Sequence, residues 1–126
     1  MLTETIAKEL HEVFADSFMK PQIEESDYFE CETEQGTSFV PADLVRLPFA
    51  VNFKAGGFFD DESPHWRALA RSLLPYVNGD ELAQVTVGHG FMARLSAPGY
   101  MDCTDWTAYE TADQAAQSLI SAYGDN

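Results

Sequence analysis

The chain has 126 residues, of which 45% are hydrophobic and 13% aromatic; this composition excludes a disordered chain and predicts one globular domain, 1–126. Seven Lys and Arg against 21 Asp and Glu give a formal charge of -14, so we expect no direct binding to nucleic acid or to anionic membranes. The sequence shows neither a secretory signal nor an apolar run of bilayer-spanning length, and we expect a cytoplasmic protein.

The first predicted element is an amphipathic helix over residues 3–19, in which apolar side chains recur at spacings of three and four. Thr3 is the expected N-cap, and Pro21 is expected to end the helix. The polar side of this helix carries an acidic stripe made of Glu9, Glu12 and Asp16.

The next segment, Ile23–Gly36, is rich in acid and contains no basic side chain. Its six carboxylates belong to Glu24, Glu25, Asp27, Glu30, Glu32 and Glu34. Apolar and small residues alternate with glutamates over 29–34, which predicts a strand with three glutamates on one exposed face. A turn at Glu-Gln-Gly then leads into a partner strand, Thr37–Val40. Acid on an edge strand also discourages unwanted sheet pairing, which is a purely structural explanation of the charge.

The middle of the chain predicts a short helical turn over 41–47 and a strand over 49–53 that ends at Gly56-Gly57. A helix with Ser63 as its N-cap is expected to run to Leu74, before Pro75. Its predicted inward face is Trp66, Leu69, Ala70 and Leu73. Arg67 and Arg71 lie on another side, where we expect them to pair with nearby acids.

The last third predicts two strands, 82–87 and 91–95, joined by a hairpin link at Gly88-His89-Gly90. A short strand over 106–109 follows, and Thr111 begins a C-terminal helix through a capping box with Gln114. The predicted buried stripe of this helix is Ala115, Leu119, Ile120 and Tyr123. The order of elements predicts an α+β fold, with a mostly antiparallel sheet of about five or six short strands and with N-terminal, middle and C-terminal helices.

Signatures of enzymes are missing from this sequence: it has no phosphate-binding glycine loop, nucleophile elbow, Cys-x-x-Cys pair or His-Glu-x-x-His. We therefore expect no cofactor and no metal site. The remaining candidate is the segment 99–106, where Asp102, Cys103 and Asp105 cluster and His89 could act as a base. The two aspartates are equally suited to forming a turn. Cys31 and Cys103 are expected to be reduced thiols.

The acidic segments favour a small protein–protein interaction module whose carboxylates occupy the basic site of a protein partner. The predicted contact residues are Glu24, Glu25, Asp27, Glu30, Glu32, Glu34, Glu9, Glu12 and Asp16. One form of this hypothesis is an inhibitor that mimics nucleic-acid charge at a nuclease or nucleic-acid-binding protein, and another is an immunity protein that neutralises a basic toxin.

Two alternatives stay open. The first is a small enzyme or ligand-binding domain that uses His89, Asp102, Cys103 and Asp105, with Arg67 or Arg71 to hold an anionic ligand. The second is an accessory subunit whose acid serves only solubility.

Overall fold

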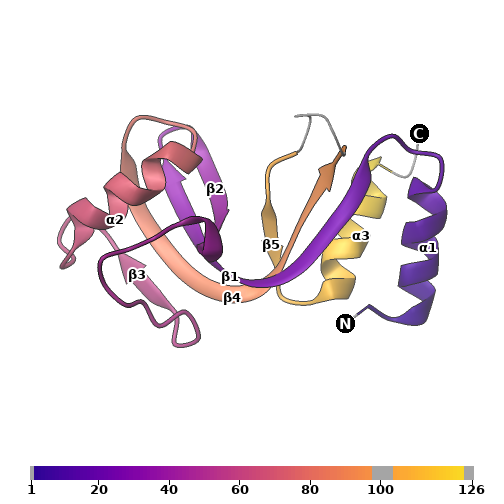
Figure 1. Ribbon diagram of the computed structural model, residues 1–126, viewed down its shortest axis with the longest axis horizontal. Helices are drawn as coiled ribbons and strands as arrows, with labels where there is room; N and C mark the ends of the chain where they lie inside the picture. Colours follow the sequence, from indigo (N-terminus) through magenta and orange to yellow (C-terminus); the bar gives the residue numbers. More distant parts are fainter. Residues whose placement is uncertain (1, 98–103, 124–126) are drawn as a thin grey trace. The chain divides into compact units, whose positions relative to one another are not determined.

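A computed structural model describes residues 2–97 and 104–123, and these ranges form three helices and five strands (Figure 1). The helices are α1 (Glu4–Phe14), α2 (Trp66–Leu73) and α3 (Ala112–Tyr123). The strands are β1 (Lys20–Thr33), β2 (Gly36–Pro41), β3 (Gly57–Phe59), β4 (Leu82–Ser96) and β5 (Thr107–Tyr109). The sheet order is β2-β1-β4-β3, with β5 also pairing with β4, and the predicted α+β class with an antiparallel sheet is confirmed.

The chain divides into two compact units, each with its own hydrophobic core. The first unit comprises Met1–Glu25 and Gly90–Asn126, and the second comprises Ser26–His89. The long strands β1 and β4 therefore contribute residues to both units. Within the described ranges, no helix is long and apolar enough to cross a bilayer.

In the first unit, α1 and α3 lie side by side and pack against residues of β4 (Figure 1). The buried residues of this core are Leu10, Phe14, Ala93, Leu95, Ala115, Ala116, Leu119 and Ile120. The capping box of α3 is confirmed, because Thr111 Oγ1 accepts the Gln114 N–H (3.1 Å) and Gln114 Oε1 accepts the Thr111 N–H (3.2 Å).

Helix α1 is shorter than predicted: it ends at Phe14, and Pro21 lies inside β1. The apolar spacing continues to Phe18, but the side chain of that residue is 64% exposed, so no core holds a further helical turn. Lys20 Nζ instead donates hydrogen bonds to the carbonyl oxygens of Phe14 (2.9 Å) and Ala15 (3.3 Å) at the end of the helix. Asp16 therefore lies beyond the helix and not on a stripe with Glu9 and Glu12.

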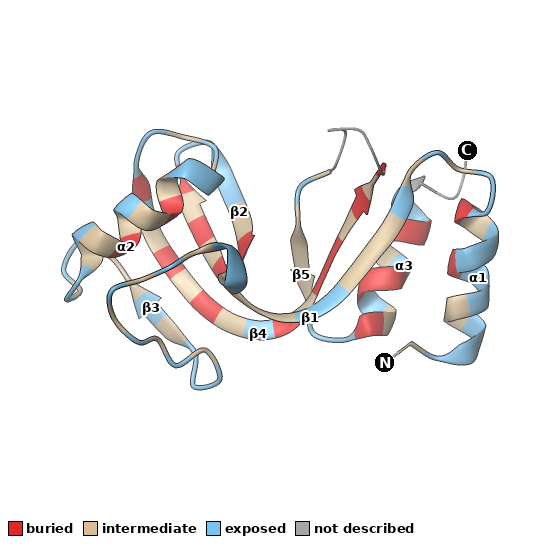
Figure 2. Cartoon of the chain, viewed as in Figure 1, coloured by how far each residue is buried: buried red, intermediate tan, exposed pale blue. Residues whose placement is uncertain are grey.

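The second unit contains the predicted hairpin, in which a two-residue turn joins Thr33 of β1 to Gly36 of β2. Strand β1 begins at Lys20, nine positions before Phe29. Along its second half, buried and partly exposed residues alternate (Figure 2). The buried residues of the second core are Phe29, Cys31, Val40, Leu69, Leu73, Leu82, Val85 and Val87. Leu69 and Leu73 come from α2, which confirms the predicted inward face of that helix.

The strand predicted over 49–53 is wrong, because these residues form no ladder with the sheet. The alternation in the sequence is nevertheless real: Phe49, Val51 and Phe53 pack against the second core, while the residues between them are exposed. The Phe53 ring meets Phe29 edge-on at 5.1 Å between centroids. An extended segment alternates in this way whether or not it has a hydrogen-bonding neighbour, and the strand that does pair with β4 is β3.

Helix α2 begins later than predicted, with His65 and not Ser63 at its N-cap. Ser63 Oγ accepts the N–H of Asp60 at 3.0 Å in the preceding turn, and His65 has a positive φ of 64°. At the other end Pro75 does not stop the chain from winding, because it lies within a 3-10 turn, Leu74–Tyr76. A similar single turn, Ala42–Leu44, occupies part of the helical turn predicted over 41–47.

The hairpin predicted at Gly88-His89-Gly90 is wrong, since β4 runs without interruption from Leu82 to Ser96. Gly88 is needed for a different reason. A Cβ at this position would lie 2.8 Å from Tyr28 Oη and 2.9 Å from Tyr28 Cζ. The glycine therefore permits the tyrosine ring of β1 to lie against the backbone of β4.

Candidate partner-binding face

One face of the sheet in the second unit combines carboxylates with aromatic rings. The β1–β2 register places Glu30 opposite Phe39 and Glu32 opposite Thr37, and directly opposed residues project to the same side of a sheet. Their neighbours Phe29, Cys31 and Val40 project to the other side, into the core. We call this surface the acidic face and define it by Tyr28, Glu30, Glu32, Thr37, Phe39 and Phe58.

Aromatic side chains flank the two carboxylates of the acidic face. The rings of Tyr28 and Phe39 make an edge contact with centroids 5.9 Å apart and an interplanar angle of 68°. Phe58 pairs with Thr86, which lies between the buried Val85 and Val87, so both Phe58 and Thr86 project away from the core. The Phe58 side chain is 56% exposed. Tyr28 and Phe39 are partly exposed. Exposed aromatic surface beside charge, as at Phe58, is typical of interaction sites.

Among the residues that the structure describes, the carboxylates of the acidic face have no cationic partner. Glu30 makes no hydrogen bond or ion pair within the described residues, while Glu32 Oε1 accepts one hydrogen bond, from Thr37 Oγ1 at 2.6 Å. No Lys or Arg occurs among the strand residues of the second unit. Its basic side chains Arg46, Lys54, Arg67 and Arg71 belong to α2 and the loops.

The thiol of Cys31 has a pKa that is raised by its burial and also by the charge of the acidic face. Burial, and then the negative charges of Glu30 and Glu32, raise the pKa of Cys31 from 9.0 to about 12. The thiol is free and lies between the two glutamates along β1, on the core side of the strand. At neutral pH it is therefore a protonated core side chain and not a nucleophile.

The structure divides the contact residues predicted from the sequence. Only Glu30 and Glu32 lie together on the acidic face, whereas Glu34 belongs to the turn between β1 and β2. The prediction of three glutamates on one strand face is therefore wrong. Asp27 precedes the alternating part of β1, is partly exposed, and has its carboxylate beside His89 of β4. The remaining acids belong to the first unit: Glu9, Glu12, Asp16, Glu24 and Glu25.

Protection of a sheet edge does not explain the glutamates. Strand β1 lies between β2 and β4 in the sheet order, and both of its sides are occupied by neighbouring strands. The edge-strand explanation for the acid is consequently wrong, because Glu30 and Glu32 lie on an interior strand.

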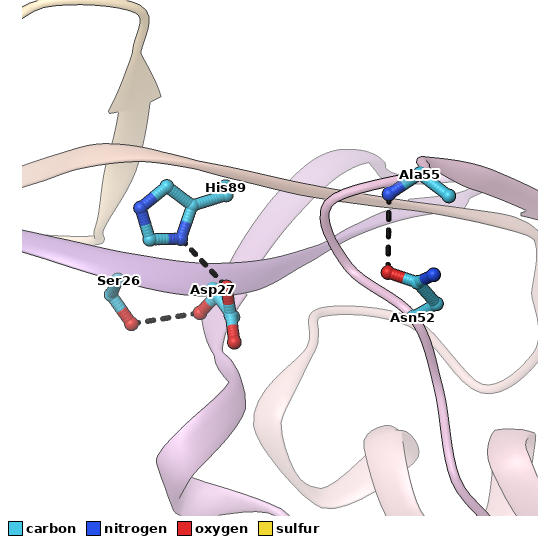
Figure 3. Close-up of polar contacts among 5 residues, drawn as sticks. All are labelled: Ser26, Asp27, Asn52, Ala55 and His89. Atoms are coloured by element: carbon cyan, nitrogen blue, oxygen red, sulfur yellow. Dashed lines mark hydrogen bonds and ion pairs between the residues drawn. The ribbon is translucent and has the colours of Figure 1, made fainter.

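His89 has a different neighbour from those predicted. Its Nδ1 lies 2.7 Å from Asp27 Oδ1, across β4 and β1, and Ser26 Oγ donates to the Asp27 carbonyl oxygen at 2.8 Å (Figure 3). Asp102 and Cys103 lie outside the described residues, and Asp105 is an exposed residue of the first unit. Among the residues that the structure describes, no three His, Cys, Asp or Glu side chains are grouped so as to hold a metal ion.

Arg67 and Arg71 do not form the ion pairs predicted for them. Both are exposed on α2, and neither makes a hydrogen bond or an ion pair within the described part of the chain. They border an open depression of about 640 Å³ that also includes Trp66 and Asp80. The nearby acids therefore do not neutralise these arginines, nor do the arginines neutralise the acidic face.

Phe39 and Phe58 are the surface residues that sequence reasoning missed. A signal for Phe39 was present, because a two-residue turn at Glu34-Gln35 fixes its position opposite Glu30. For Phe58 no such signal existed, since the strand of this region was predicted over 49–53 and not at Gly57–Phe59.

In comparisons with known proteins, no protein family, no curated protein and no solved structure matches the chain.

Proposed function

We propose that this protein is an acidic binding module whose acidic face occupies the basic site of a protein partner, and that it acts as an inhibitor by mimicking nucleic-acid charge there. The main observation behind the proposal is that Glu30 and Glu32 share one side of β1 and form no ion pair with any Lys or Arg in the described part of the chain.

The chemistry of the two glutamates supports a partner rich in arginine. Alternate residues on a strand are spaced by about 7 Å, so the carboxylates form a short row of anionic groups. Carboxylates, like phosphates, accept paired hydrogen bonds from a guanidinium group. The aromatic rings of Tyr28, Phe39 and Phe58 supply apolar contact area and faces on which cations stack.

Long-range electrostatics support the same kind of partner. A formal charge of -14 attracts a basic protein and accelerates its association at low ionic strength, while it repels nucleic acid. The protein would therefore compete with nucleic acid for a shared partner without binding nucleic acid itself.

The test is capture of partners from a lysate at low salt, identification by mass spectrometry, and measurement of the affinity of each purified partner. We expect a basic nuclease or nucleic-acid-binding protein whose Kd rises at least about tenfold when salt is raised from about 50 to 300 mM. Duplex DNA should displace this protein from that partner. The variant E30Q/E32Q should weaken the complex by about tenfold or more, because it removes both charges while retaining side-chain size.

A matched control is D61N/E62Q, which changes net charge equally in the loop before α2, outside the acidic face. Its Kd should change by less than about threefold. Equal weakening by both variants would mean that net charge alone matters. Wild-type affinity in E30Q/E32Q, or the absence of any basic partner, would refute the proposed interface.

A further inference from the structure

Strand β2 presents an unpaired edge of the sheet directly beside the acidic face. It is the terminal strand in the order β2-β1-β4-β3, and its only strand partner in the described residues is β1. In an antiparallel pair, backbone groups point alternately toward and away from the partner strand. The pair Thr33–Gly36 closes a two-residue turn and is hydrogen-bonded, so Ser38 and Val40 also point toward β1.

The N–H and C=O groups of Thr37 and Phe39 therefore point outward from the sheet. Within the described residues, neither backbone makes a hydrogen bond to a turn, a loop or a side chain, and β2 pairs with no strand other than β1. Devices that usually protect an edge, such as lysine or an interior proline, are missing from Gly36–Val40. Pro41 limits the edge at its far end, because it has no N–H to donate.

Charge determines which kind of strand this edge accepts. A strand added beside β2 would lie about 10 Å from β1, and its alternate side chains would project on the same side as Thr37 and Phe39. From there the long side chains of arginine or lysine extend across the short Thr37 toward Glu32 and Glu30. A second copy of this chain would instead bring two sets of uncompensated glutamates together, each on a molecule of charge -14.

We infer that the outer edge of β2 receives an extended basic segment of the partner as an added strand, with Lys or Arg at alternate positions facing Glu30 and Glu32. Main-chain hydrogen bonds to Thr37 and Phe39 would give this contact its affinity. The two glutamates would make it selective for basic segments. This inference rests on the proposed function, which it deepens by specifying the conformation and the sequence pattern of the bound segment.

The test uses a peptide of about seven residues in which Arg alternates with Thr, with blocked ends, and a second peptide N-methylated at the backbone amides that would pair. Binding to the full-length protein is measured by fluorescence anisotropy at about 20 mM NaCl. We expect the N-methylated peptide to bind at least about tenfold more weakly, because it has the same charge but lacks the backbone donors. The parent peptide should also slow amide hydrogen exchange of Thr37 and Phe39, whereas Ser38 and Val40 are already protected by β1.

The outcomes separate this inference from the proposed function. Equal binding of the two peptides, or no new protection at Thr37 and Phe39, overturns strand addition while a loss of binding in E30Q/E32Q still supports the acidic face. Protection at Thr37 and Phe39 with unchanged affinity in E30Q/E32Q overturns the selectivity argument and the proposed interface. No binding of either peptide overturns the inference. A dimer in sedimentation that protects Thr37 and Phe39 without peptide also overturns it, in favour of a second copy.

Discussion

The ring of Tyr28 lies so close to Gly88 that a Cβ on the glycine would be 2.8 Å from Tyr28 Oη. This contact links the acidic face to β4, because it determines where the Tyr28 ring lies beside Phe39. The glycine is thus part of the packing of the face and does not mark a turn.

The Gly88→Ala substitution should therefore act through Tyr28. We expect it to reduce the free energy of unfolding by about 1–3 kcal/mol, since the ring or the strand must shift to admit the methyl group. In a Tyr28→Ala background the same substitution should cost less than about 0.5 kcal/mol. Urea denaturation of the wild type, the two single variants and the double variant gives the coupling free energy between Gly88 and Tyr28. If Gly88→Ala costs the same in both backgrounds, a direct contact is contradicted.

The capping threonines of the two helices in the first unit should differ in importance. Thr111→Ala should cost about 1 kcal/mol, because its Oγ1 accepts the N–H of Gln114. Thr3 has the matching position before α1 but makes no side-chain cap bond; its main-chain N–H donates to Asp113 Oδ1 at 2.8 Å, and that bond survives in Thr3→Ala. Thermal unfolding should show a larger decrease in Tm for Thr111→Ala than for Thr3→Ala. The reverse order would be inconsistent with the observed caps.

Two glycines with the same φ separate backbone strain from steric contact. Gly36 and Gly79 both have φ of 116°, but a Cβ at Gly36 meets nothing within 4 Å, whereas one at Gly79 would lie 2.8 Å from Thr33 Oγ1. Thr33 is buried, and its hydroxyl donates to the Asn78 carbonyl oxygen at 2.7 Å. Gly36→Ala should cost about 1–2 kcal/mol from strain alone. Gly79→Ala should cost at least about 1 kcal/mol more, and similar losses in denaturant midpoint would contradict this packing.

The sequence predicted best those features that depend on neighbouring residues. Three such features depend on residues two to four positions apart: the capping box at Thr111, the two-residue turn after Thr33 and the apolar stripe of α2. Each follows from local geometry, so composition and periodicity were sufficient to predict it.

Predictions failed where the same local pattern serves two different tertiary environments. Gly88-His89-Gly90 is compatible with a hairpin, but the continuous β4 uses Gly88 to admit the ring of Tyr28, which lies far away in the sequence. The alternation at 49–53 arises from packing on a core and not from pairing in a sheet. The prediction that Glu34 shares a strand face with Glu30 and Glu32 likewise failed, because β1 ends at Thr33. Such distinctions depend on contacts between distant segments, which periodicity does not encode.

The thiol of Cys31 predicts a specific dependence of stability on pH. Because its folded pKa is raised to about 12, the thiol stays protonated in the folded protein while it ionises in the unfolded chain above about pH 9. Its contribution to stability is therefore fully present below pH 9 and is lost as pH rises toward 12, by up to about 1.4 kcal/mol per pH unit.

Urea denaturation of the reduced wild type and of Cys31→Ala, at pH values from about 8 to 10, isolates this effect from other groups that titrate in the same range. The alanine variant is less stable throughout, because a buried side chain is truncated, but its stability should fall less steeply with pH. Parallel profiles for the two proteins would show that the folded environment does not raise the pKa of the thiol.

The acidic face should reduce the stability of the protein if it is maintained for binding. Glu30 and Glu32 repel each other across one side of β1, and no cation among the described residues offsets the repulsion. We expect E30Q/E32Q to raise the free energy of unfolding by about 0.5 kcal/mol at low salt, and the gain to shrink in about 0.5 M NaCl, where charges are screened. The amide oxygen introduced by E32Q can still accept the hydrogen bond of Thr37, so the hairpin keeps its geometry.

The control variant D61N/E62Q should give no comparable gain in stability, because those acids lie ahead of the positive end of α2. If E30Q/E32Q is more stable and yet binds the basic peptide more weakly, the two glutamates serve recognition at the expense of stability. Unchanged or lower stability in E30Q/E32Q would contradict the expected repulsion between Glu30 and Glu32.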